Sequence, residues 1–98
     1  MPTKTPIPVA RAQRSIAANL SLARRQQRIT VDLLAERAGI SVPTLRRLLN
    51  DGEGSLETYL RVCRILGLLD GAVAVSDPLN TAIGRIRADE DTPLRVRR

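Results

Sequence analysis

LLAERAGISVPTLRRLL, residues 33–49, contains two short helical patterns separated by a glycine. The first is expected to end at Gly39, because glycine fits the left-handed conformation that closes a helix at low cost. Two residues later, Ser41 is suited to cap the start of a second helix. Pro43 fits the first turn of that helix, because amides there have no partner within the helix. The stretch therefore predicts one helix that stops and another that starts almost at once.

The second helix, from Val42 to about Leu49 or Asn50, has an apolar and a polar face. Its apolar face consists of Leu45, Leu48 and Leu49. The spacing i, i+3, i+4 and i+7 brings the other residues together on the outward face: Pro43, Arg46, Arg47 and Asn50, with Val42 alongside. Two helices joined by a tight glycine corner, with a polar second helix, form a helix-turn-helix, whose second helix fits the DNA major groove. A purely structural helical hairpin is the alternative.

Helical patterns continue on both sides of this corner. Ser15 is expected to cap a helix that runs to about Gln27, and Thr30 to cap the helix that ends at Gly39. Ser55 precedes LETYLRVCRILGL, which predicts a further helix that ends at Gly67. The expected inward residues of the flanking helices are Ile16, Leu20 and Ala23, then Leu56, Leu60, Cys63 and Leu66.

The composition favours an all-α fold of four to five helices. Hydrophobic residues make up 43% of the 98 residues, yet Tyr59 is the only aromatic one. A core of Leu, Ile, Val and Ala suits short packed helices better than a β-sandwich.

Three segments are expected along the chain. Residues 1–14 contain three prolines and predict a flexible basic arm, and residues 15–69 form the helix-turn-helix domain. Residues 70–98 are expected to be an extended or partly disordered extension used for dimerisation or partner binding. Within it, LLDGAVAVSD is compatible with a short helix or a strand, whereas Leu79, Ile83 and Ile86 have helical spacing.

The charge pattern points to an acidic polymer as partner. The chain has 16 basic and 10 acidic residues, a net charge of +6, and every basic residue except Lys4 is arginine. Residues 1–29 hold six basic and no acidic groups, so the positive field belongs to the N-terminal half. Guanidinium groups suit phosphates and guanine edges. Aromatic stacking platforms for single-stranded nucleic acid are missing, which leaves double-stranded DNA as the better partner.

The same composition argues against other classes. The chain has no histidine and a single cysteine, Cys63, so we expect no metal site, no disulfide, no cofactor and no enzyme activity. Asp89, Glu90 and Asp91 are adjacent acids in the tail, for which simple solvation is the expectation. No stretch is apolar enough for a signal peptide or membrane span, which predicts a cytoplasmic protein.

Residues 16–69 resemble the phage-repressor-like helix-turn-helix family, the Xre or Cro/C1 type. Its pattern, LT..ELA...GIS..TL..L followed by a helix near an SLET-like phrase, is matched by ITVDLLAERAGISVPTLRRLLNDGEGSLETYLRVCRILGL. The resemblance implies that Val42, Pro43, Arg46 and Arg47 contact bases. It also implies contacts with the DNA backbone at the corner, and the arginine-rich end of the preceding helix is expected to add further ones. The expected DNA-backbone contacts are Arg24, Arg25, Arg28, Thr30, Ser41, Thr44 and Asn50.

The chain departs from that family at two places. Val31 stands where many members have a phosphate-binding glutamine, and Leu49 stands where many have a glutamate paired with an arginine at the position of Arg24. We therefore expect Arg24 to be free for a phosphate, with further phosphate contacts from Arg25 and Arg28 and from three basic residues of the arm: Lys4, Arg11 and Arg14.

The family's mode of action implies a homodimer on a near-palindromic operator, because one domain covers only a half-site. The expected dimer or partner contacts are Leu68, Leu69, Val73, Val75, Ile83 and Ile86. The first four have an alternative role in completing the monomer's own core.

The tail carries a narrower resemblance. LGLLDG, a DPL phrase, GRIRA and a basic end PLRVRR are similar to HipB-like antitoxins, which are encoded beside HipA-type kinase toxins in bacteria. This resemblance implies a repressor of its own operon that also binds a HipA-like kinase. Two alternatives are a protein whose main role is toxin neutralisation and a phage-type or plasmid-type repressor without a toxin.

Overall fold

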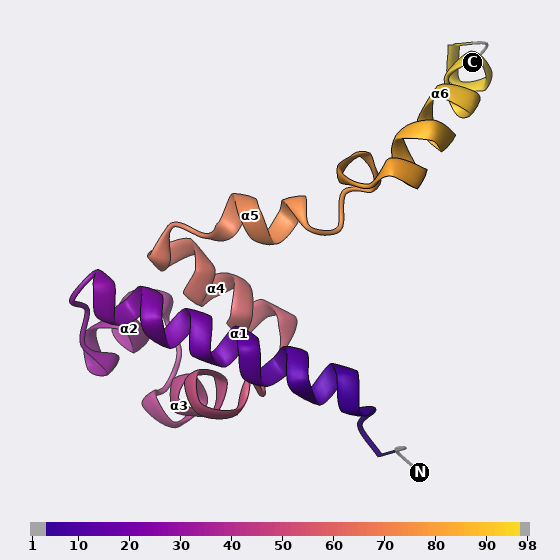
Figure 1. Cartoon of the computed structure of the whole chain (residues 1–98). Helices are drawn as coiled ribbons and strands as arrows, with labels where there is room; N and C mark the ends of the chain where they lie inside the picture. Colours follow the sequence, from indigo (N-terminus) through magenta and orange to yellow (C-terminus); the bar gives the residue numbers. More distant parts are fainter. Residues whose placement is uncertain (1–3, 97–98) are drawn as a thin grey trace. The chain divides into compact units, whose positions relative to one another are not determined.

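The computed structural model describes the backbone of residues 4–96 and the side chains of residues 4–90. All regular structure within these residues is helical, which confirms the all-α prediction (Figure 1). The chain divides into two compact units, residues 1–68 and residues 69–98. The first contains the predicted helix-turn-helix.

Helix α1, Ile7–Gln26, begins earlier than predicted. The sequence suggested a flexible arm to residue 14 and a cap at Ser15, but both are wrong, since residues 7–14 are helical and Ser15 lies inside α1. The physical reason is that Pro6 occupies the N-cap position and Pro8 the first turn, where a proline removes no intrahelical hydrogen bond. These prolines start the helix.

Helices α2, Val31–Ala38, and α3, Val42–Asp51, form the predicted corner. The Oγ1 of Thr30 accepts a hydrogen bond from the Leu33 amide at 3.1 Å, and the Oγ of Ser41 accepts one from the Thr44 amide at 3.2 Å. Gly39 ends α2 with φ at 71°, a value that glycine adopts without strain. The stop and start signals of the sequence are therefore confirmed.

Helix α4, Leu56–Leu66, begins and ends where predicted, at the Ser55 cap and Gly67. Its inward face differs in part from the prediction. Cys63 and Leu66 are buried, but Leu56, in the first turn of α4, is 71% exposed. Val62, which the sequence did not single out, is fully buried instead.

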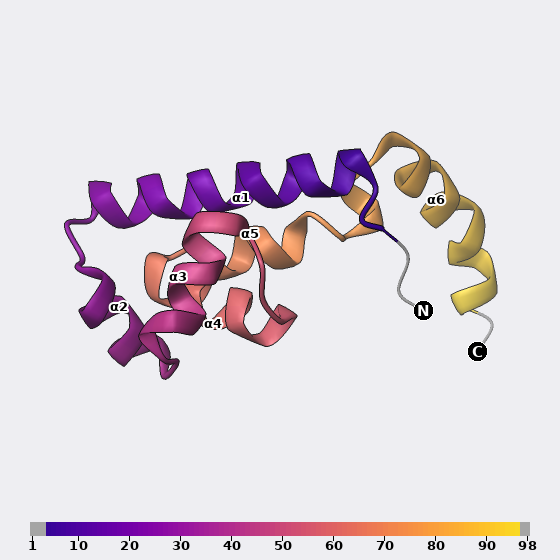
Figure 2. The same cartoon turned by 90° about the horizontal axis from the view of Figure 1, so that it is seen from below.

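The core of the first unit lies where α1 packs on α3 and α2 packs on α4 (Figure 2). Ile16 was predicted to face inward but is 38% exposed, whereas its neighbour Ala17 is buried. The buried side chains are Ala17, Leu20, Ile29, Leu34, Ala35, Ala38, Leu45, Leu48, Leu49, Val62, Cys63 and Leu66.

The second unit consists of α5 (Leu69–Ala74), a short 3-10 helix η1 (Pro78–Asn80) and α6 (Ala82–Val96). Where the sequence left helix and strand open, the structure has α5, and the helical spacing of Ile83 and Ile86 corresponds to α6. Gly84 is required where α6 meets η1, because a Cβ there would collide with the carbonyl of Pro78. None of the described side chains of this unit is buried. The basic end PLRVRR lies outside the residues whose side chains are described.

Candidate nucleic-acid interface

Helix α3 presents one polar and one apolar face, as its sequence predicted. Leu45, Leu48 and Leu49 are 0%, 3% and 7% exposed and anchor α3 in the core. The opposite face carries the predicted base-contacting side chains. Pro43, Arg46, Arg47 and Asn50 are exposed there, and Val42 and Thr44 are half-buried beside them.

Hydrogen bonds stabilise both ends of α3, and the one at its C-terminal end joins it to α1. At the start, the Oγ of Ser41 caps the helix, and at the end the Oγ of Ser21 in α1 donates a hydrogen bond to the Leu49 carbonyl at 2.9 Å. The second bond is one that the sequence did not indicate, because Ser21 is far away along the chain. The bond to α1 and the buried leucines anchor α3, so Arg46 and Arg47 project from a firmly packed helix, which favours precise contacts.

The hydroxyl groups expected to contact the DNA backbone are partly engaged. Thr30 and Ser41 use theirs to cap α2 and α3. The Ser41 hydroxyl also donates to the Oγ1 of Thr44 at 2.7 Å. The Thr44 hydroxyl thus accepts a hydrogen bond and keeps its own proton, as the Thr30 hydroxyl does, whereas the Ser41 proton is already donated.

Three arginines gather around the end of α1. Arg25 and Arg28 are exposed, but Arg24 is half-buried and its Nη1 donates to the Ile29 carbonyl at 2.8 Å. The Arg24 Nε is buried and has no hydrogen-bond partner within the described residues. The expectation that Arg24 is wholly free is therefore wrong, since this side chain closes the turn between α1 and α2.

Arg28 is the one residue other than glycine with a positive φ in the part of the chain that the structure describes, at 57°. A side chain in this left-handed conformation costs roughly 1 kcal/mol, and glycine would avoid the cost. Arg28 is exposed at this position, so its guanidinium group lies at the surface of the first unit.

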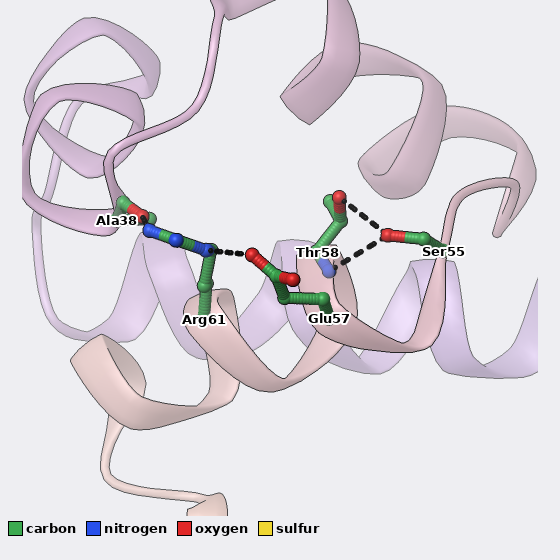
Figure 3. A network of polar contacts seen from close by, with 5 residues as sticks. All are labelled: Ala38, Ser55, Glu57, Thr58 and Arg61. Carbon is green, nitrogen blue, oxygen red and sulfur yellow. Dashed lines mark hydrogen bonds and ion pairs between the residues drawn. The ribbon is translucent and has the colours of Figure 1, made fainter.

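Arg61 links α4 to the helix-turn-helix corner (Figure 3). Its Nε donates to a carboxylate oxygen of Glu57 at 2.8 Å, and its Nη1 donates to the Ala38 carbonyl at 3.2 Å. Ala38 is the last residue of α2, so α4 satisfies a carbonyl that the helix end would leave unpaired. Sequence analysis missed this contact, for which the only signal was the i, i+4 spacing of Glu57 and Arg61.

The remaining chemistry of the first unit is apolar. Burial raises the pKa of the Cys63 thiol, and the Tyr59 hydroxyl beside it lowers that pKa in part, so Cys63 is an unreactive core residue.

Within residues 4–90, no three carboxylate or thiol groups gather as they would around a metal ion. None of the described helices combines the length and the apolar character that a membrane span requires.

The predicted dimer or partner residues share high exposure. Leu68 ends the first unit and is 39% exposed, and Leu69 is half-buried at the start of α5. The others lie on the second unit and are at least 60% exposed within this single chain: Val73, Val75, Ile83 and Ile86.

Comparison with protein families agrees with this geometry. The model of the Cro/C1-type HTH DNA-binding domain matches residues 19–68, slightly more than half of the 98-residue chain. The matched region includes the last part of α1, from residue 19 onward, and the whole of α2, α3 and α4. No curated protein and no solved structure matches the chain.

Proposed function

Because the chain belongs to the Cro/C1-type helix-turn-helix DNA-binding family, we propose that it represses transcription as a homodimer bound to a near-palindromic operator. In this proposal α3 enters the major groove and places its outward face on the base edges. Repression then follows from occlusion of the promoter by the bound dimer.

The observation that carries the proposal is the exposed face of α3. Arg46 and Arg47 project from a helix whose other face is anchored by fully or nearly fully buried leucines. A guanidinium group forms two hydrogen bonds with guanine, each such pair contributing about 1 to 3 kcal/mol of discrimination. Val42 and Pro43 supply apolar contacts, for example to a thymine methyl group.

Phosphate contacts then come from the surroundings of α3. Arg25 and Arg28 are exposed near the start of α2, and the Thr44 hydroxyl retains a proton for donation. Such contacts fix the register of the protein on the duplex, and base contacts select the sequence.

A dimer is proposed because one domain covers only a half-site. Exposed apolar side chains support it, since Leu68, Val73 and Val75 are each at least 39% exposed in the single chain. Burying such groups against a second copy removes apolar area from water at roughly 25 cal/mol per Å².

A second proposed role is that of an antitoxin for a HipA-like kinase, with operator binding as autoregulation. It rests on α6, where Ile83 and Ile86 are 66% and 60% exposed beside Arg87 and Glu90. An apolar strip bordered by both charges fits a protein partner better than DNA. A repressor without a toxin partner would use the same strip for its own dimer.

Selection of duplexes from a randomised pool tests the DNA-binding role. We expect enrichment of two half-sites in inverted orientation, with guanines at positions that depend on Arg46 and Arg47. Recovery of unrelated sequences after several rounds would contradict sequence-specific binding.

A double substitution, Ile83→Glu with Ile86→Glu, separates the two roles of α6. Sedimentation of this variant reports on the dimer, and co-purification with a kinase encoded beside the chain's own gene reports on the antitoxin role. Loss of the kinase with an intact dimer supports the antitoxin role of α6. Retention of the kinase would show that it binds elsewhere than Ile83 and Ile86, and a wild-type chain that does not bind the kinase would contradict the antitoxin role.

A further inference from the structure

We propose that Arg14 and Asn50 together bind one DNA phosphate beyond the C-terminal end of α3. This inference rests on the proposed function and adds a contact from a part of α1 that lies outside the matched family domain. It also assigns a role to the N-terminal turns of α1.

Helix α1 extends well beyond the family domain. It begins at Ile7, whereas the matched region begins at residue 19, so roughly three helical turns precede that region. These turns carry Arg11 and Arg14 and no acidic residue, and Lys4 comes just before them. All three basic side chains are exposed.

The added turns are held against the end of α3. Gly52 follows α3 with φ at 70°, and a Cβ at this position would overlap the Gln13 carbonyl of α1. The Gln13 Nε2 also donates to the Gly52 carbonyl at 3.4 Å. The first half of α1 therefore lies directly beside the end of α3, and it is not a free arm.

A shallow groove of about 290 Å³ lies at this junction, and both Arg14 and Asn50 line it. Asn50 belongs to the same outward face of α3 as Arg46 and Arg47. A duplex contacted by that face brings its backbone past the end of α3, where the groove opens. An arginine and an amide on one groove supply the donors that a phosphate accepts.

The charges around the groove are mixed, and they restrict a phosphate to the Arg14 side. Asp51 and Glu53 also line it, yet within residues 4–90 Arg14 forms no ion pair with either. Its guanidinium group is thus available, and the two carboxylates repel a phosphate from their side. The contact is expected to be weaker than an isolated arginine would give, and Asp51→Asn should strengthen it.

Fluorescence anisotropy across a salt series tests the proposal with Arg14→Ala and Asn50→Ala in the full chain. Arg64→Ala is the matched control, because it removes the same charge from an exposed site on α4. For Arg14→Ala we expect affinity to fall about tenfold equally on the selected and a shuffled duplex. The slope of log affinity against log salt should fall by about 0.9, the value for one phosphate.

Replacing single phosphates of the selected duplex with neutral methylphosphonates then tests whether the two residues share one phosphate. At one phosphate position, the replacement should lower the DNA affinity of the wild type but cause no further loss of affinity in Arg14→Ala or in Asn50→Ala. If the two variants are insensitive at different positions, or at no position, the two residues do not share one phosphate.

The outcomes separate this inference from the proposed function. If Arg14→Ala and Arg64→Ala have the same affinity and salt dependence while the wild type still prefers the selected duplex, Arg14 does not bind a phosphate. The proposed sequence-specific regulator is then unaffected. If the wild type binds both duplexes equally but only Arg14→Ala lowers the salt slope, the Arg14 contact stands and sequence-specific regulation fails.

Discussion

Arg61 Nη1 lies 3.2 Å from the carbonyl oxygen of Ala38, so a residue of α4 closes the end of α2 just before the Gly39 turn. The same guanidinium group binds Glu57 on its own helix (Figure 3). Arg61 therefore ties α4 to the last residue of α2, directly before the corner that leads into α3.

Replacing Arg61 with alanine should lower the free energy of unfolding by about 1 kcal/mol, the usual net value of a hydrogen bond. Urea denaturation measures it. Glu57→Gln is the control and should change stability by less, because an exposed ion pair contributes only about 0 to 1 kcal/mol. Equal losses for both variants would show that the ion pair matters and that the bond to Ala38 does not.

The close approach of α1 to the end of α3 predicts that Gly52→Ala destabilises the protein strongly. Gly67→Ala is the control, since Gly67 also has a positive φ, of 77°. A Cβ added at Gly67 would have open space around it, with no neighbouring atom within 4 Å. Gly67→Ala should cost about 1 kcal/mol for the left-handed backbone alone. Gly52→Ala should exceed this, because the added Cβ also displaces Gln13. Thermal unfolding that shows equal losses would mean that α1 does not contact this residue.

The left-handed conformation of Arg28 predicts a separation of stability from DNA affinity. Arg28→Gly should raise stability by about 0.5 to 1 kcal/mol, because glycine removes the cost of the positive φ. Arg28→Ala loses the charge but keeps the backbone cost, so its stability should stay near that of the wild type. Both variants should bind DNA more weakly if Arg28 contacts a phosphate. Unchanged affinity would leave the arginine at this position without an explanation.

Cys63 predicts a loss of stability at alkaline pH. Burial raises the pKa of its thiol, so the unfolded chain releases this proton at a lower pH than the folded chain does. The contribution of the protonated Cys63 thiol to the free energy of unfolding is complete below the pKa that the thiol has in the unfolded chain. It is lost as the pH rises above about 9 and through the higher pKa of the folded chain. Tyr59, whose pKa burial also raises, adds to the loss at still higher pH. In urea titrations at several pH values, Cys63→Ala should show a smaller decline between pH 8 and about pH 9.5; an unchanged decline would exclude the thiol.

The features that sequence analysis predicted correctly depend on local signals. Thr30, Ser41 and Ser55 cap helices, and Gly39 and Gly67 end them, because capping needs only residues a few positions apart. The spacing i, i+3 and i+4 likewise identified the buried and exposed faces of α3, because helical periodicity alone decides which residues share a face.

The errors arose where distant segments meet. Pro6 and Pro8 suggested a flexible arm, although their first-turn positions and the contact with Gly52 make residues 7–14 part of α1. Arg24 was expected to be free, but it closes a turn whose shape depends on the left-handed Arg28. The bonds from Ser21 to Leu49 and from Arg61 to Ala38 depend on helix packing, which no short-range pattern encodes.

The most direct test of sequence-specific recognition by α3 is fluorescence anisotropy of the wild type and of the double variant Arg46→Ala, Arg47→Ala on the selected and shuffled duplexes. Near physiological salt, the wild type should prefer the selected duplex by about a thousandfold or more. The double variant should retain binding to the shuffled duplex with only a modest loss and forfeit most of that preference, since each guanine pair contributes about 1 to 3 kcal/mol. A double variant that keeps the full preference would contradict the assignment of α3 as the helix that selects the sequence.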